Sequence, residues 1–107
     1  MVSITYSPKE GFLNIKGHAG SGEPGHDLIC AAVSALCHTL EANLQHLDGI
    51  GFLADYHAEI KPGKAKYVFK AAEGDLAVVR NTVNNIAVGF EILAKKAPEN
   101  VQYTLYT

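Results

Sequence analysis

The fold is decided by a stretch that reads DYHAEIKPGKAKYVFK, from Asp55 to Lys70. Apolar and polar residues alternate on both sides of its central KPGK, which contains the proline and glycine typical of a tight turn. If the two halves pair across this turn, apolar residues face apolar residues and acids face lysines. The stretch therefore predicts a β-hairpin with Tyr56 opposite Phe69, Ala58 opposite Tyr67, Glu59 opposite Lys66 and Asp55 opposite Lys70.

A second hairpin is predicted at the start of the chain. Ile4 and Tyr6 alternate with polar residues before a turn at residues 7–11, and Leu13 and Ile15 alternate after it. At the other end of the chain, the alternation of Val101, Tyr103 and Leu105 predicts a last strand.

Two long amphipathic helices are predicted between these strands. From Asp27 onwards apolar residues recur three and four apart, and the pattern stops near Asp48-Gly49. A second run of this kind covers residues 76–94 and is ended by Ala97-Pro98. The order ββαββαβ favours one α+β domain over residues 1–107, a two-layer sandwich of a mostly antiparallel five-stranded sheet with both helices on one face. The buried stripe of the first helix is expected to contain Ile29, Val33, Leu36, Leu40, Leu44 and Leu47.

Composition narrows the classes of partner. The 107 residues are 48% hydrophobic and carry a net charge of −2, which is ordinary for a globular domain and lacks the basic excess of a nucleic-acid-binding protein. The lysines between Lys61 and Lys70 are interpreted as a solvated strand face beside Asp55 and Glu59. The longest uncharged apolar run, from Leu28 to Leu36, is too short to span a membrane, and no signal peptide is recognisable. We therefore expect a cytoplasmic protein without nucleic-acid or membrane partners.

The stretch GHAGSGEPGHDLIC, residues 17–30, is the candidate functional site. It places His18 at a strand end and Cys30 in the first turn of a helix. There the helix dipole and free N–H groups favour a thiolate, and a nearby imidazole accepts its proton. The N–H groups of this turn, including that of Cys30, are candidate oxyanion donors. The alternative interpretation of Cys30 is a small buried hydrophobic residue, and Cys37 is interpreted as a packing residue.

The residues around Cys30 have alternative roles. Asp27 either caps the helix or orients the imidazole of His18, and the two roles are compatible. Ser34, one turn after Cys30, is either a small packing residue or a hydrogen-bonding partner of the site. His26 is interpreted as a spectator or a substrate contact. Three loop glycines are expected to form a gate over the bound substrate, namely Gly20, Gly22 and Gly25.

Three other kinds of site are disfavoured. Residues 20–25 spell GxGxxG, but the chain is too short for the doubly wound sheet that a dinucleotide fingerprint needs. A metal site built from His18, His26, Cys30 and Cys37 matches no zinc spacing, so we expect no metal. A disulfide is disfavoured because the two cysteines would lie two helical turns apart, roughly 10 Å at about 1.5 Å per residue.

The motifs GHA at residues 17–19 and GHDLICAAVSAL at residues 25–36 resemble those of the ribosomal-processing cysteine proteases, the Prp family. The resemblance extends over essentially the whole chain. It implies an endopeptidase without a cofactor that removes the N-terminal extension of large-subunit ribosomal protein L-twenty-seven. It further implies a homodimer, His18 as base, Cys30 as nucleophile, and Asp27 and Ser34 as supporting residues.

Two other hypotheses remain open from the sequence. The chain is either a non-enzymatic ribosome-associated binding module, in which Cys30 is merely small, or a thiol-based redox or metal module. The reactivity of Cys30 distinguishes them, because an inert thiol titrates near the free value of about 8.5.

Overall fold

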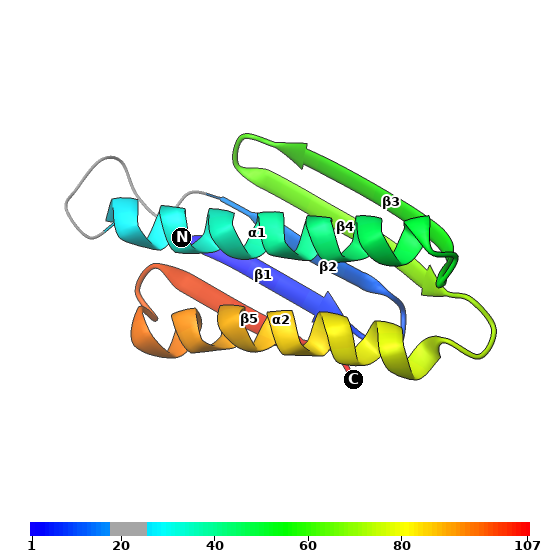
Figure 1. Ribbon diagram of the computed structural model, residues 1–107. Helices are drawn as coiled ribbons and strands as arrows, with labels where there is room; N and C mark the ends of the chain where they lie inside the picture. Colours follow the sequence, from blue (N-terminus) through cyan, green and yellow to red (C-terminus); the bar gives the residue numbers. More distant parts are fainter. Residues whose placement is uncertain (18–25) are drawn as a thin grey trace.

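The computed structural model describes residues 1–17 and 26–107, and within these ranges the side chains of all residues except His26 and Asp27. Its elements follow the predicted order ββαββαβ (Figure 1). They are β1 (Val2–Ser7), β2 (Phe12–Lys16), α1 (His26–Gly49), β3 (Leu53–Lys61), β4 (Lys64–Ala71), α2 (Leu76–Lys96) and β5 (Val101–Leu105).

The five strands form one sheet in the order β3-β4-β2-β1-β5. Three of the four neighbouring pairs are antiparallel, and only β1 and β5 run parallel, which confirms the mostly antiparallel sheet. Figure 1 shows both helices over the same face of this sheet, running in opposite directions. Since β2 pairs antiparallel with both β1 and β4, the strand before the GxGxxG spelling is not part of a doubly wound sheet.

The register of the second hairpin is confirmed at all four predicted pairs: Asp55 with Lys70, Tyr56 with Phe69, Ala58 with Tyr67 and Glu59 with Lys66. The ion pairs differ from this backbone register. The Glu59 carboxylate lies 2.9 Å from the Lys61 ammonium and 4.0 Å from that of Lys64. These side chains are long and exposed, so they can form ion pairs with residues other than the one directly opposite. Each such exposed pair contributes little to stability.

The core lies between the sheet and the two helices. Four residues of the stripe predicted for α1 are buried, while Ile29 and Leu36 are half-buried and pack against the same cluster. The four are Val33, Leu40, Leu44 and Leu47. They meet the inward side chains of the central strands, including Ile4, Tyr6, Leu13 and Tyr67, each at most 1% exposed. This packing fixes the face that α1 turns toward the sheet.

The two helices approach each other at Gly89 of α2. A Cβ atom at this position would lie 2.7 Å from Cδ2 of Leu36 and 3.0 Å from its Cδ1. The side chain of Leu36 therefore occupies the space that any larger residue at position 89 would need.

We predict that Gly89→Leu lowers the free energy of unfolding by about 2 kcal/mol, because the added side chain overpacks the helix contact. Gly89→Ala should change it by less than about 1 kcal/mol, since the far end of Leu36 can rotate and alanine is the better helix former. Val88→Leu is the control, because Val88 is 50% exposed on the same helix. Denaturant unfolding measures all three, and equal stability of Gly89→Leu and Val88→Leu would contradict the packing described.

Candidate active site

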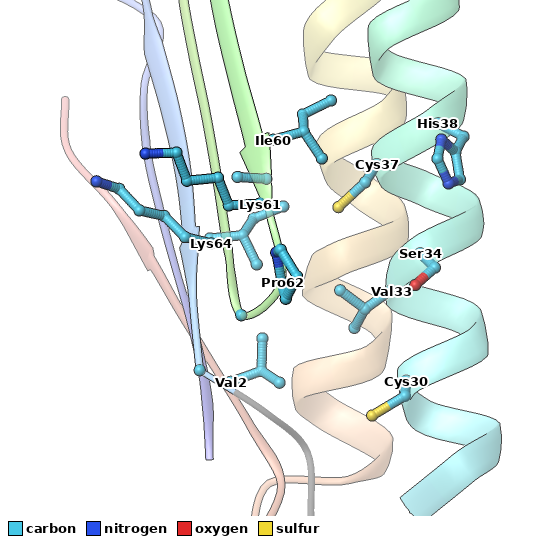
Figure 2. A pocket seen from close by; sticks show the side chains of 14 residues that line it. Val2, Cys30, Val33, Ser34, Cys37, His38, Ile60, Lys61, Pro62 and Lys64 are labelled. Atoms are coloured by element: carbon cyan, nitrogen blue, oxygen red, sulfur yellow. The ribbon is translucent and has the colours of Figure 1, made fainter.

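A cavity of about 310 Å³ opens between the first half of α1, the end of β2 and the turn that joins β3 to β4. Helix α1 lines it with Cys30, Val33, Ser34, Cys37 and His38, and the turn lines it with residues 60–65 (Figure 2). The cavity thus brings the predicted nucleophile together with a β-turn that sequence reasoning had not assigned to the site.

Cys30 lies at the border of the core. Its side chain is half-buried and packs against the core cluster, and Figure 2 shows the sulfur directed from α1 toward the sheet. Cys30 and Cys37 are both free thiols, in agreement with the expected absence of a bridge between them. A half-buried thiol that borders a cavity is accessible to a ligand that enters it.

Helix α1 is described from His26 onward, and Cys30 is its fifth described residue. The cap at Asp27 stays a prediction. The first four N–H groups of a helix have no acceptor within it, and the role of these groups as oxyanion donors stays a prediction. Helical side chains lean toward the N-terminus, which brings the Cys30 sulfur back toward the first turn.

Cys37 borders the same cavity two turns further along α1, with its sulfur also directed toward the sheet (Figure 2). Burial raises the pKa of this thiol to about 11, with a smaller opposing effect of Tyr67 and a further rise from the charge of Glu41. The Tyr67 hydroxyl donates a hydrogen bond of 2.9 Å to the Cys37 carbonyl oxygen. A thiol with this pKa is neutral near pH 7, which supports the interpretation of Cys37 as a packing residue.

Three histidines have described side chains. His38 belongs to the cavity lining, at its margin on α1. His57 is exposed on β3, with its Nε2 3.2 Å from Asp55, and His46 is exposed in the last turn of α1. His18 stays the predicted base of Cys30. His18 lies outside the described residues, and the side chain of His26 is not described.

The remaining predicted site residues are only partly placed. Ser34 lines the cavity and is exposed. Its supporting role and that of Asp27 stay predictions, as does the gate at Gly20, Gly22 and Gly25, which lie outside the described residues. No group of His, Cys, Asp and Glu side chains that could hold a metal ion occurs within residues 1–17 and 28–107.

The turn between β3 and β4 makes the cavity apolar. Ile60 and Pro62 face α1 across it, whereas Figure 2 shows the ammonium groups of Lys61 and Lys64 directed away from α1. The sequence predicted this turn but not its place, because the pairing of β4 with β2, which carries it to the site, joins residues far apart in the chain.

Gly17 connects this turn to the residue predicted as the base. Its N–H donates a hydrogen bond of 2.9 Å to the Gly63 carbonyl oxygen, and its φ is +101°. A Cβ atom at Gly17 would lie 2.2 Å from the Met1 carbonyl oxygen. Only glycine fits here, so the chain leaves β2 toward His18 from a fixed point on the cavity wall.

We predict that Gly17→Ala lowers the free energy of unfolding by about 2–3 kcal/mol, because it combines a positive φ with a backbone clash. Gly51→Ala is the matched control: the φ of Gly51 is +82°, but nothing lies within 4 Å of an added Cβ atom. The control should lose only about 1 kcal/mol. If denaturant unfolding finds the two variants equally stable, the close approach at Gly17 is refuted.

Comparison with known proteins gives one family and several similar folds. The family model described as cysteine protease Prp matches residues 1–102. No curated protein sequence matches the chain significantly. None of the described helices is long and apolar enough to cross a membrane.

Three solved structures are similar to this chain, each aligned over 99% of it. The crystal structure of SMU.848 from Streptococcus mutans has a TM-score of 0.68 at 24% identity, over 92% of that chain. Two structures of the essential ribosomal processing protease Prp from S. aureus align over 100% of that protein. They have TM-scores of 0.74 and 0.73 at 19% and 16% identity. One holds a covalently linked product peptide and the other a substrate peptide. At these identities the likeness shows a shared fold.

Proposed function

Because the chain belongs to the Prp family of cysteine proteases, we propose that it uses Cys30 and His18 to remove the N-terminal extension of ribosomal protein L-twenty-seven. The observation that carries this proposal is the half-buried Cys30 thiol at the border of an apolar cavity, with its sulfur directed toward the sheet. The covalently linked product peptide in the S. aureus relative supports a covalent reaction of the same kind.

The proposed reaction proceeds through a thioester. His18 accepts the thiol proton, and the Cys30 sulfur attacks the carbonyl carbon of the scissile peptide bond. As the tetrahedral intermediate collapses, the C–N bond breaks and the imidazolium donates its proton to the leaving amine. Water, deprotonated by His18, then hydrolyses the thioester and restores the Cys30 thiol. No oxidant or metal takes part in this sequence.

The choice of His18 as base is supported by Gly17. This residue lines the cavity together with Cys30 and is held by its hydrogen bond to Gly63. His18 directly follows Gly17 in the sequence, so the proposed base is covalently joined to a residue of the cavity wall. Asp27 is proposed to orient the imidazole, and Ser34 to hydrogen-bond at the cavity margin.

The lining of the cavity suits an extended peptide with apolar side chains. Val2, Ile15, Val33 and Ala65 form its buried surface, and the nearby lysines contribute their aliphatic stems. Because transfer of apolar surface from water is favourable by about 25 cal/mol per Å², such side chains would supply binding energy close to the nucleophile.

The direct experiment is to incubate the protein with a peptide that spans the processing site of the L-twenty-seven precursor. Mass spectrometry should find two products that result from cleavage of one bond, and a chelator should leave the rate unchanged. A scrambled peptide of the same composition is the control. If the authentic peptide stays intact under conditions in which the protein is folded, the assignment of this substrate is wrong.

The family resemblance also implies a homodimer that acts in the cytoplasm, and we retain both as proposals. Light scattering coupled to gel filtration should give twice the chain mass of 11.5 kDa. A monomer at the enzyme concentration of an active assay would show that the dimer is not required.

A further inference from the structure

We propose that Cys37, together with Ile60, determines the size of the substrate side chain that the cavity admits. This inference rests on the proposed protease function and adds a specificity-determining pair to it. Both residues line the cavity, Cys37 from α1 and Ile60 from the end of β3 (Figure 2).

The distance between Cys30 and Cys37 along α1 supports this role. Cys37 follows Cys30 by seven residues, which corresponds to about 10 Å along the helix axis. An extended peptide covers this length in about three residues. A side chain that reaches Cys37 therefore belongs to a residue within about three positions of the bond attacked by Cys30.

The backbone around Cys37 is firmly held, so the side chain at position 37 controls the available space. Tyr67 is fully buried, at 0% exposure, and its hydroxyl donates a hydrogen bond to the Cys37 carbonyl oxygen. Neighbouring Val33 and Leu40 are buried in the core one turn before and after. Because α1 is anchored on both sides, a larger residue at position 37 takes volume from the cavity and does not push the helix away.

The side chain of Cys37 is also chemically suited to contact an apolar substrate side chain. Its thiol is small and stays protonated near neutral pH, so it presents a weakly polar surface that tolerates an apolar side chain. Across the cavity Ile60 is 42% exposed and adds apolar surface to the cavity lining. A bound apolar side chain would cover both residues.

The test compares peptides that carry alanine or phenylalanine, in turn, at each position within three residues of the cleaved bond. At one position the wild-type protein should prefer phenylalanine by about tenfold in kcat/KM, the size of discrimination that an apolar pocket gives. Cys37→Leu should bring this ratio close to one, mainly through KM. Ala42→Leu is the matched control, because Ala42 is exposed on the same helix and does not line the cavity. It should keep the wild-type ratio.

Ile60→Ala gives a second test that does not depend on how well the core accepts a leucine. Since Ile60 is exposed at 42%, the variant should remain folded, and its preference for phenylalanine should fall about threefold through lost apolar contact. An unchanged ratio in both Cys37→Leu and Ile60→Ala would overturn the proposal.

Alkylation separates failure of this inference from failure of the protease assignment. Rates at Cys30 are measured by peptide mapping with iodoacetamide and with its N-benzyl derivative. In Cys37→Leu the rate at which the benzyl reagent alkylates Cys30 should fall about tenfold relative to the rate with iodoacetamide. This holds whether or not any peptide is cleaved. Loss of peptide cleavage in the wild type would refute the protease function alone, and equal slowing of both reagents would refute the role of Cys37.

Discussion

Replacement of Cys30 by alanine is expected to lower kcat/KM for the precursor peptide by at least about 10³-fold, because no other group in the proposed reaction forms the thioester. The fold should persist. Cys30 is only half-buried at the edge of the core, and the substitution removes a single heavy atom. Peptide cleavage followed by mass spectrometry measures the first effect, and denaturant unfolding measures the second.

Cys37→Ala is the matched control for this experiment. It removes the same atom from the other cysteine of the cavity, whose pKa is raised to about 11 by burial. On a peptide with alanine at each position within three residues of the cleaved bond, which leaves Cys37 without a large side chain to contact, the control should stay within about threefold of the wild-type rate, since no bond forms at its sulfur. Comparable losses in the two variants would show that the thiol of Cys30 has no special role.

Replacement of His18 by alanine is the second large effect, with an expected loss of at least about 10²-fold in kcat/KM at pH 7. The imidazole is proposed to transfer a proton in both halves of the reaction, and such transfers contribute about 10²–10⁴-fold. Added imidazole should restore part of the rate.

His46→Ala is the control for His18→Ala, because His46 is exposed in the last turn of α1 and does not line the cavity. Its loss should leave the rate unchanged. If His46→Ala and not His18→Ala abolished cleavage, the proposed pairing of His18 with Cys30 would be wrong.

Local patterns were sufficient to predict the elements of the fold. The register from Asp55 to Lys70 follows from alternation and from one turn, and both lie within sixteen consecutive residues. The helix stripes follow in the same way from spacing along the chain. The parallel pairing of β1 with β5 and the contact of β4 with β2 could not be predicted, since they depend on which strands meet after both helices have packed.

The same distinction holds for the site. The sequence placed Cys30 near the start of a helix, and the structure has it there. The opposite wall of the cavity was missed. Ile60 and Pro62 come from a turn whose sequence shows only a hairpin, and its position over α1 is a property of the assembled sheet.

The most direct test of Cys30 as the nucleophile is affinity labelling with a chloromethyl ketone made from the N-terminal fragment that cleavage releases. The account predicts loss of activity in step with the incorporation of one label per chain, and peptide mapping should find that label on Cys30. His18→Ala should slow the labelling, and excess substrate should protect against it. Stoichiometric labelling of Cys37 instead, or full activity after complete labelling of Cys30, would contradict the account.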